Sequence, residues 1–259
     1  MIDTLIINAH PDPHSTASAT NRMVAHLLAK LPAGSVQTVN LAEADIQPLD
    51  KAVLEMFTVT LFQGQQPNEE QAALQARLMS VVNQVKSARR LVIAYPMYNF
   101  AIPALLKNWL DNLVIPGETF RYGEDGTPKG LMGEHKVLLL QASGSVYSEG
   151  PMAQMDFASS YLKTLLGGFL GFASVDTVYA EGTAGNWEAA VQRACAKIDD
   201  VYDHFARSAP GARTSSDRRA TKRAAFDAPR IALDARSALP KGGSNGSDAN
   251  VRPRAVAAP

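Results

Sequence analysis

Residues 91–111 read LVIAYPMYNFAIPALLKNWLD, and this stretch decides the fold. It starts with an apolar run at residues 91–94, typical of a buried strand, and ends in the amphipathic pattern of a helix at 103–113. Residues 96–100, Pro-Met-Tyr-Asn-Phe, break both patterns. In an open α/β sheet a ligand lies just beyond the carboxyl end of such a strand. The break therefore predicts a site with aromatic faces, an amide side chain and free backbone N–H groups, which suits a flat ring with polar edges.

The same alternation of strand and helix runs along most of the chain. Short apolar runs predict strands at residues 4–9, 35–41, 91–94, 136–141 and 174–179. Helical patterns occupy residues 17–31, 68–87, 103–113, most of 150–172 and 187–207, with a short helix and loop within 50–63. Such alternation forms a parallel sheet with helices on both faces. It favours a flavodoxin-like, doubly wound, five-stranded parallel α/β sheet in three layers over a barrel, which needs eight strands.

One segment, between residues 115 and 133, interrupts this alternation. Residues 119–122 have the composition of a short strand, Asp125-Gly126 is a hairpin turn signal, and a return strand is expected near 127–131. We expect this small β-hairpin to extend over the ligand-binding edge of the sheet.

The 259 residues divide into two parts of different composition. Residues 208–259 hold 10 Lys and Arg against 4 Asp, a net charge of +6, which leaves 15 against 21 and −6 for residues 1–207. Pro, Gly, Ser, Ala and Arg dominate the second part and its apolar periodicity is lost, which predicts a disordered basic tail. We expect a flavodoxin-like domain at 1–207 without a nucleic-acid partner, because only the tail could offer a basic surface.

Other features limit the class of protein. No apolar run reaches the roughly 20 residues that a membrane span requires, and the N-terminus lacks the positive region of a signal peptide. The single cysteine, Cys195, excludes an internal disulfide. His10 and His14 are four residues apart, but two intervening prolines break any helix, so no metal site is expected. These features favour a cytoplasmic protein without a membrane partner.

The loop after the first strand, from Asn8 to Asn21, is rich in small hydroxyl residues. It leads into a helix, where Ser18 and Thr20 could donate hydroxyl hydrogen bonds. A helix N-terminus presents unpaired N–H groups and a partial positive charge, which suits a phosphate. The loop has no Lys or Arg and matches neither the dinucleotide nor the P-loop pattern. It predicts either a phosphate held by neutral donors or a helix cap without a ligand.

A third loop, residues 141–147 (QASGSVY), follows the fourth strand. Its small residues let the backbone approach a ligand closely. In this fold the loops after strands one, three and four meet at one edge. A phosphate site, an aromatic surface and a small-residue loop at one edge together predict a bound flavin.

On these residues the chain resembles the FMN-dependent NADH-azoreductase family, within the flavodoxin-like NAD(P)H:quinone oxidoreductases, over about residues 4–205. The resemblance is carried by residues 96–100 (PMYNF), 106–108 (LKN), 119–122 (TFRY), 150–151 (GP) and 180–182 (AEG). It implies an oxidoreductase that binds FMN, forms a homodimer, and builds each active site from both subunits. It also implies two-electron reduction of quinones and azo compounds by NADH or NADPH, a choice of donor that the residues leave open.

The resemblance implies roles for individual residues. The FMN phosphate would contact His10, Ser18, Ala19 and Thr20. The flavin ring would contact Pro96, Met97, Tyr98, Asn99 and Phe100, and its pyrimidine end Ala142, Ser143, Gly144 and Ser145. The substrate pocket would be shaped by Phe100, Phe120 and Phe169. Family members often have Ser in place of His10 and an Arg-Gly-Gly-like run at 143–145, so the flavin potential stays open.

We expect a ping-pong cycle in which NAD(P)H reduces the flavin and leaves, and the acceptor then takes its place. Asn99 would fix the ring edge, and N–H groups near Gly144 would stabilise negative charge. Tyr147 would close the site as an aromatic lid or donate a proton. Two alternatives remain: a flavodoxin-like electron carrier without a small-molecule substrate, and a redox sensor that presents the basic tail.

Overall fold

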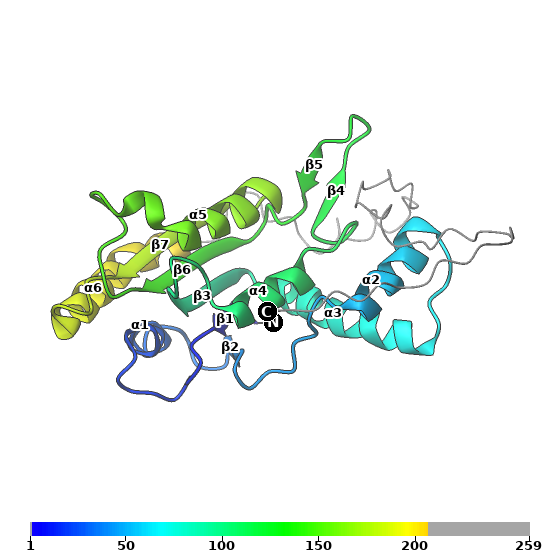
Figure 1. Ribbon diagram of the computed structural model, residues 1–259. Helices are drawn as coiled ribbons and strands as arrows, with labels where there is room; N and C mark the ends of the chain where they lie inside the picture. The colour runs from blue at the N-terminus through cyan, green and yellow to red at the C-terminus, as the bar shows by residue number, and fades with distance from the viewer. Residues whose placement is uncertain (1, 207–259) are drawn as a thin grey trace, which may run out of the picture. The chain divides into compact units, whose positions relative to one another are not determined.

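The computed structural model describes residues 2–206 of the chain. Its main element is a parallel sheet of five strands in the order β2-β1-β3-β6-β7 (Figure 1). The strands are β1 (Thr4–Asn8), β2 (Val36–Asn40), β3 (Arg90–Pro96), β6 (Lys136–Ala142) and β7 (Ser174–Ala180). The predicted flavodoxin-like, five-stranded parallel sheet is confirmed.

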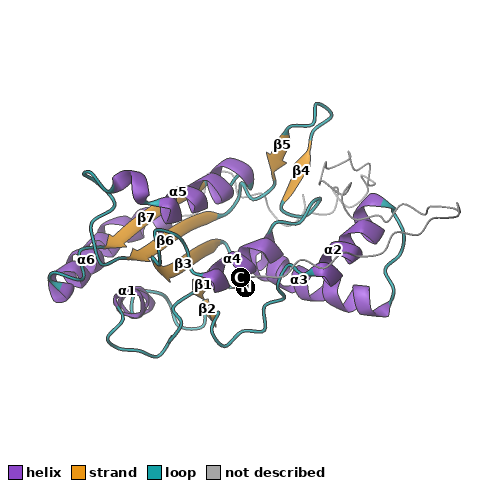
Figure 2. Ribbon diagram, in the orientation of Figure 1, coloured by secondary structure: helices purple, strands orange, loops and turns teal. Residues whose placement is uncertain are grey.

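Helices flank the sheet (Figure 2). The long ones are α1 (Ala19–Leu28), α3 (Glu69–Ser87), α4 (Ala104–Leu113) and α6 (Trp187–Ala206). The shorter ones are α2 (Lys51–Phe57), α5 (Phe157–Leu162), the π-helical η1 (Thr58–Phe62) and η3 (Lys163–Phe169), and the 3-10 turn η2 (Ala153–Met155). Residues of α1 and α6 share one hydrophobic core with the sheet, and residues of α3, α4 and α5 share another. The two cores on opposite faces confirm the three-layer arrangement.

The strand sequences explain both cores. Successive side chains of a strand point to opposite faces. Leu5 and Ile7 of β1 lie in the core with α3, α4 and α5, whereas Ile6 lies in the core with α1 and α6, and all three are 0% exposed. Because both faces are covered, the three central strands β1, β3 and β6 are apolar along most of their length. This is why continuous apolar runs identified them.

The predicted helix at residues 68–87 shows how well a boundary can be read. Asn68 Oδ1 accepts a hydrogen bond from the Gln71 N–H at 2.9 Å, and Gln71 Oε1 accepts one from the Asn68 N–H at 3.1 Å. This reciprocal capping box satisfies two N–H groups that have no partner inside the helix. By contrast, the predicted helical stretch 150–172 is divided among η2, α5 and η3.

The sheet order places a topological switch point between β1 and β3. The chain passes from β1 to β2 on one side and then returns across the sheet to β3 on the other. The crossover helices that leave β1 and β3 therefore lie on opposite faces, α1 on one and α4 on the other. Such a divergence opens a crevice at the carboxyl ends of the two strands.

The expected hairpin is present as β4 (Phe120–Tyr122) and β5 (Pro128–Gly130), antiparallel to each other. It follows α4, which runs back from the carboxyl edge of the sheet to the amino edge, and it projects at that end in Figure 1. Its neighbour there is the segment before β7, because the Met132 N–H donates to the Leu170 carbonyl at 3.0 Å. The expectation that the hairpin covers the ligand-binding edge of its own sheet is therefore wrong, since α4 carries the chain to the opposite edge.

The last described helix is fixed to the amino edge of the sheet. Arg90 Nε donates to the Phe205 carbonyl at 2.9 Å, and Lys136 Nζ donates to the His204 carbonyl at 2.9 Å. Cations at these carbonyls also complement the negative end of the helix dipole. The predicted tail, residues 208–259, lies outside the described residues, so the domain boundary stays a prediction.

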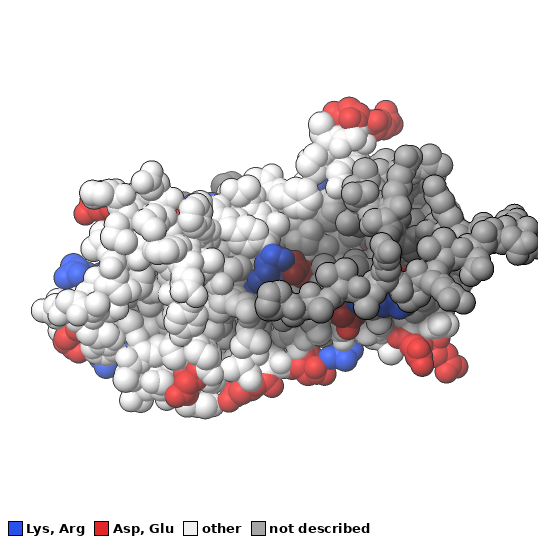
Figure 3. All heavy atoms as spheres, viewed as in Figure 1, with Lys and Arg blue, Asp and Glu red and all other residues white. Residues whose placement is uncertain are grey.

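Among residues 2–206, none of the helices combines the length and apolar character that crossing a bilayer requires. On the face shown in Figure 3, acidic side chains are more widespread than basic ones, in keeping with the net charge of −6 for residues 1–207.

Candidate functional site

Three loops begin side by side at the carboxyl edge of the sheet. Strand pairing places Asn8 beside Ala94, and Pro96 beside Ala142. Backbone hydrogen bonds extend these pairings into the loops: the Ala9 N–H donates to the Ala94 carbonyl at 2.8 Å, and the Met97 N–H to the Ala142 carbonyl at 2.7 Å. The predicted meeting of the loops after strands one, three and four is thus present in the structure, where these strands are β1, β3 and β6.

The aromatic loop after β3 is a tight turn under strain. The N–H groups of Tyr98 and Ala101 donate to each other's carbonyl at 3.0 and 2.9 Å, and the two residues between them have positive φ, 49° at Asn99 and 68° at Phe100. Asn adopts this left-handed region readily, whereas a bulky residue such as Phe does so rarely. Because its bonds engage only Tyr98 and Ala101, the turn leaves the Asn99 and Phe100 N–H groups without an acceptor among residues 2–206. Strain of this kind is characteristic of functional sites.

This strain predicts an inverted order of stability at position 100. At a position with ordinary backbone angles, a Gly variant is less stable than an Ala variant, because Gly loses more conformational entropy on folding. At positive φ we expect the reverse, with Phe100→Gly more stable than Phe100→Ala by about 1 kcal/mol. Urea unfolding of the flavin-free protein measures the difference, and Ala101→Gly is the control, which should destabilise. A Gly variant less stable than the Ala variant at position 100 would refute the strain.

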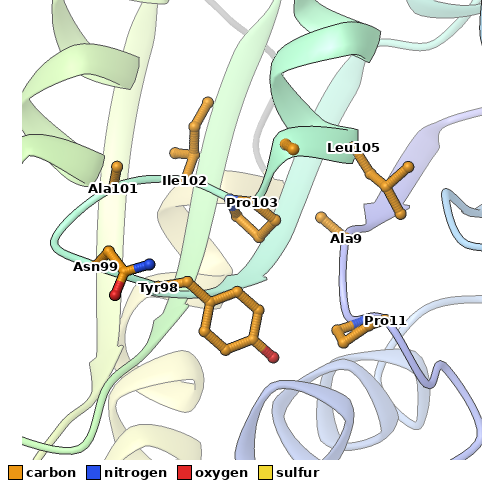
Figure 4. A pocket seen from close by; sticks show the side chains of 9 residues that line it. Ala9, Pro11, Tyr98, Asn99, Ala101, Ile102, Pro103 and Leu105 are labelled. Carbon is orange, nitrogen blue, oxygen red and sulfur yellow. The ribbon is translucent and has the colours of Figure 1, made fainter. Parts of the chain in front are cut away.

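Beside this turn lies a cavity of about 450 Å³. The loop after β1 lines it with Ala9 and Pro11. The loop after β3 and the start of α4 line it with seven further residues: Tyr98, Asn99, Ala101, Ile102, Pro103, Ala104 and Leu105. Figure 4 shows the Tyr98 ring extending from one loop toward Pro11 on the other. The cavity occupies the switch-point edge, and its lining is mostly apolar, as ligand sites usually are.

The first loop ends in the N-terminus of α1. Ser18, Ala19 and Thr20 are all buried there. Ser18 Oγ caps the helix by accepting the Asn21 N–H at 3.2 Å, which leaves the hydroxyl proton of Ser18 free to donate. In the described part of the chain, the Ala19 and Thr20 N–H groups and the Thr20 Oγ1 have no hydrogen-bond partner. The predicted helix cap is therefore present beside unpaired donors, and the binding of a phosphate by this loop stays a prediction.

The two histidines of this loop have separate partners. His10 Nδ1 lies 2.6 Å from the Asp12 carbonyl oxygen, within its own loop. His14 Nε2 lies 2.6 Å from Oε1 of Glu43, and hydrogen bonds from Asn40 and from His14 lower the pKa of that carboxyl. His14 is therefore directed toward β2 and its following loop, while His10 stays at the end of β1.

The loop after β6 borders the same edge. Ala142 and Ser143 are buried, whereas Gly144 and Ser145 are exposed. Tyr147 meets the Phe100 ring edge to face, with ring centroids 6.1 Å apart and an interplanar angle of 73°. Sequence reasoning assigned these two aromatic residues to different loops, and the structure brings them into contact.

A buried polar pair lies beneath the two loops. The Tyr95 hydroxyl donates to Gln141 Oε1 at 2.8 Å, and both residues are 0% exposed. Burial raises the pKa of Tyr95 well above its usual range, so the phenol stays neutral. These residues directly precede Pro96 and Ala142, the last residues of β3 and β6, and their hydrogen bond joins the ends of the two strands.

Comparisons with known proteins agree with this geometry. The profile of the flavodoxin-like fold family matches residues 3–201. An FMN-dependent NADH:quinone oxidoreductase 1 of Bacillus cereus is 35% identical over 190 residues, covering 71% of this chain and 88% of the relative. The chain belongs to the family of FMN-dependent NADH:quinone oxidoreductases. A Lactiplantibacillus plantarum relative of the same name is 34% identical over 79% of this chain and 99% of its own length.

A solved structure extends the likeness to the fold. The FMN-dependent NADH-azoreductase of Bacillus anthracis, solved in complex with FMN, matches with a TM-score of 0.73 and 32% identity. The match covers 80% of this chain and 100% of the solved chain. The resemblance to this family, drawn from short motifs such as residues 96–100, is thus confirmed over most of the chain.

In this member of the quinone oxidoreductase family, the three expected substrate residues do not meet within one chain. Phe120 packs against Phe169 with ring centroids 4.6 Å apart, and Phe120 is 4% exposed. Both lie at the amino edge of the sheet with the hairpin, whereas Phe100 lies at the carboxyl edge. A pocket formed by all three residues would need more than one copy of the chain.

Sequence reasoning missed two residues that organise the site. Asn21 Nδ2 donates to the carbonyls of Asp12 and Ser15 at 2.9 Å each, and so holds the first loop against α1. Glu181 accepts hydrogen bonds from two N–H groups of the loop after β6. The available signal for Asn21 was its place in the first turn of a helix, beside a loop rich in Ser and Thr. Glu181 had been considered only as part of the family motif at residues 180–182, so its structural role was not predicted.

Proposed function

We propose that the protein is an FMN-dependent oxidoreductase that takes two electrons from NADH or NADPH and delivers them to quinones and azo compounds. The observation that carries this proposal is the assembly of the three loops at one edge, with unpaired N–H donors on each side of an aromatic turn. The named activities of its relatives, an NADH:quinone oxidoreductase and an NADH-azoreductase, support the same class of reaction.

The first loop fits the phosphate of FMN. The Ala19 and Thr20 N–H groups and the Ser18 hydroxyl proton supply neutral donors at a helix N-terminus, which attracts an anion. The Thr20 hydroxyl, buried without a partner in the described residues, would reach the same phosphate after rotation about χ1. His10 would stand at the strand end beside it.

The other two loops fit the flat ring. Residues 96–100 would border the ring, with Asn99 and the free N–H groups of the turn at its polar edge. The N–H groups of Gly144 and Ser145 would face the pyrimidine end and stabilise negative charge there, with Ala142 and Ser143 beneath. Tyr147 would close over the site beside Phe100. Bound FMN would supply the hydride chemistry, which no side chain of the site provides.

We propose that two copies of the chain form the active unit. Phe120 and Phe169 lie at the opposite edge from Phe100, so they would complete the substrate pocket of a second copy in a homodimer. We also propose a cytoplasmic location, because the sequence has a single cysteine, Cys195, and so cannot form the internal disulfides that are common in oxidising compartments. Sedimentation velocity and subcellular fractionation test these two statements, which a monomer or a periplasmic protein would contradict.

We propose further that residues 1–207 form the FMN-binding domain and that residues 208–259 are a disordered basic tail outside it. The hydrogen bonds of Arg90 and Lys136 to the end of α6 support a boundary there. A chain that ends at residue 207 should then bind FMN and turn over like the full chain. Loss of either property on truncation would contradict the boundary.

The absorption spectrum of the purified protein tests the main proposal. We expect the visible bands of a flavin, and release of FMN on denaturation. Under anaerobic conditions NADH or NADPH should bleach the bands completely, and benzoquinone should restore them. Steady-state rates should follow ping-pong kinetics, because the nicotinamide and the acceptor use the same place.

Two results would contradict the proposal in different ways. A colourless protein that takes up no added FMN would remove the flavin. A protein that binds FMN, but is bleached by dithionite and not by either nicotinamide, would instead be an electron carrier.

A further inference from the structure

The loop after β7 is joined to the loop after β6 by one carboxylate. Glu181 Oε2 accepts hydrogen bonds from the Tyr147 N–H at 2.8 Å and the Ser148 N–H at 3.0 Å. The Ser148 hydroxyl donates to the other oxygen, Oε1. Three donors of one loop thus converge on a single side chain of the other. Because three hydrogen bonds end on one side chain, this clamp restrains residues 147–148.

The same two loops are also joined through their backbones. Three carbonyls of the loop after β6, at Ser143, Gly144 and Ser145, accept from N–H groups of the loop after β7 at 3.1–3.3 Å, and the donors are Thr183, Ala184 and Gly182 respectively. These carbonyls therefore turn toward β7. In the described structure the Gly144 and Ser145 N–H groups keep no such partner and stay available to a ligand.

The clamp fixes an aromatic contact at the site. Tyr147, whose N–H is held by Glu181, sets its ring against Phe100 on the loop after β3. Glu181 thereby connects the loops after β7, β6 and β3 in one chain of contacts. Its carboxylate acts through Tyr147, since its hydrogen-bond partners among residues 2–206 all belong to residues 147 and 148.

We propose that Glu181 is a positioning residue that holds Tyr147 as a lid beside Phe100 and so sets the affinity of the site for the nicotinamide and the acceptor. This inference rests on the proposed function. It concerns geometry and not charge, because an amide of the same shape can replace every contact. Gln Oε1 can accept both N–H groups, and its Nε2 can donate to the Ser148 hydroxyl oxygen.

Glu181→Gln and Glu181→Ala in the full chain separate geometry from charge. We expect Glu181→Ala to raise the KM for NADH and for benzoquinone about tenfold, because only a fraction of the molecules would keep the lid in place. The kcat should change less than KM, as for a loss of binding alone. Glu181→Gln should keep wild-type constants. Asp50→Ala is the matched control: it removes a carboxylate that accepts the Val53 N–H at 3.0 Å, but at the start of α2.

Amide hydrogen exchange of the flavin-free chain provides a readout that needs no activity. The Tyr147 and Ser148 amides should exchange about tenfold faster in Glu181→Ala than in the wild type or Glu181→Gln, if their hydrogen bonds are lost. A wild-type protein that binds no FMN would end the proposed function, yet this exchange would still support or overturn the clamp. Unchanged exchange in Glu181→Ala would overturn the proposal, and so would a Gln variant with wild-type exchange but the kinetics of the Ala variant.

Discussion

Gly130→Ala is expected to displace the hairpin from the segment at Leu170 and to lower the free energy of unfolding by about 3 kcal/mol. This is near the upper end of the usual cost of overpacking. A methyl group at Gly130 would lie 2.2 Å from the carbonyl carbon of Leu170 and 2.3 Å from its oxygen. The obstruction is backbone, so no side chain can rotate away to relieve it. The segment at Leu170 and the hairpin must separate, which also threatens the bond from the Met132 N–H to the Leu170 carbonyl.

The same substitution tests the proposed two-copy site. FMN should stay bound, because the three loops that would hold it lie at the opposite edge of the sheet. The kcat/KM for benzoquinone should fall about 100-fold, the size of effect that a displacement of about 1 Å can produce, if Phe120 on the hairpin completes the site of a second copy. Urea unfolding, the visible spectrum and steady-state kinetics measure the three effects on one preparation.

Gly133→Ala is the matched control for Gly130→Ala. A methyl group at Gly133 would meet its nearest neighbour, the Gly171 carbonyl oxygen, at 3.6 Å, an ordinary contact. Stability and activity should therefore stay close to wild type. If Gly130→Ala loses stability but reduces benzoquinone at the wild-type rate, each chain holds a complete site and the hairpin has no part in it.

The central strands of the sheet were predictable because their burial requires a sequence pattern that can be recognised. Strands buried on both faces must be apolar along their length, and runs such as residues 136–141 stand out between polar loops. The boundaries were less accurate where a polar residue belongs to the strand. Residues 91–94 were predicted for β3, yet the strand continues through Tyr95, whose hydroxyl is satisfied by Gln141 inside the core. An apolar pattern cannot reveal such a pair.

The location of the site was also predictable, but its internal contacts were not. The switch-point rule places a ligand beyond β1 and β3 whatever the side chains are. The predicted position of the hairpin was wrong because turn signals identify a hairpin but do not indicate at which edge of the sheet the preceding helix ends. The clamp by Glu181 depends on loop geometry, and a Glu after a strand carries no signal for it. The π-helical segments η1 and η3 were not predicted either, because the change to π-type hydrogen bonds does not alter the helical pattern of the sequence.

Thr20→Val is expected to stabilise the flavin-free protein and, at the same time, to weaken FMN binding. Thr20 is 1% exposed, and its Oγ1 has no hydrogen-bond partner within residues 2–206. Val has the same shape and removes the unpaired hydroxyl, so the free energy of unfolding should rise by about 1 kcal/mol. A hydroxyl donor to a charged phosphate is worth about 1.5–3 kcal/mol, so its loss should raise the Kd for FMN by about tenfold to 100-fold.

Thr4→Val separates the two effects. Thr4 is 0% exposed and its Oγ1 also lacks a partner in the described chain, but it begins β1 at the edge opposite the three loops. Val should therefore stabilise there as well, without any change in the affinity for FMN. Urea unfolding and fluorescence titration with FMN measure both quantities for each variant. A gain of stability at both positions with a loss of affinity only at Thr20 means that this hydroxyl is kept, against the stability of the free protein, for the phosphate. Equal affinities would assign the phosphate to the backbone N–H groups and Ser18 alone.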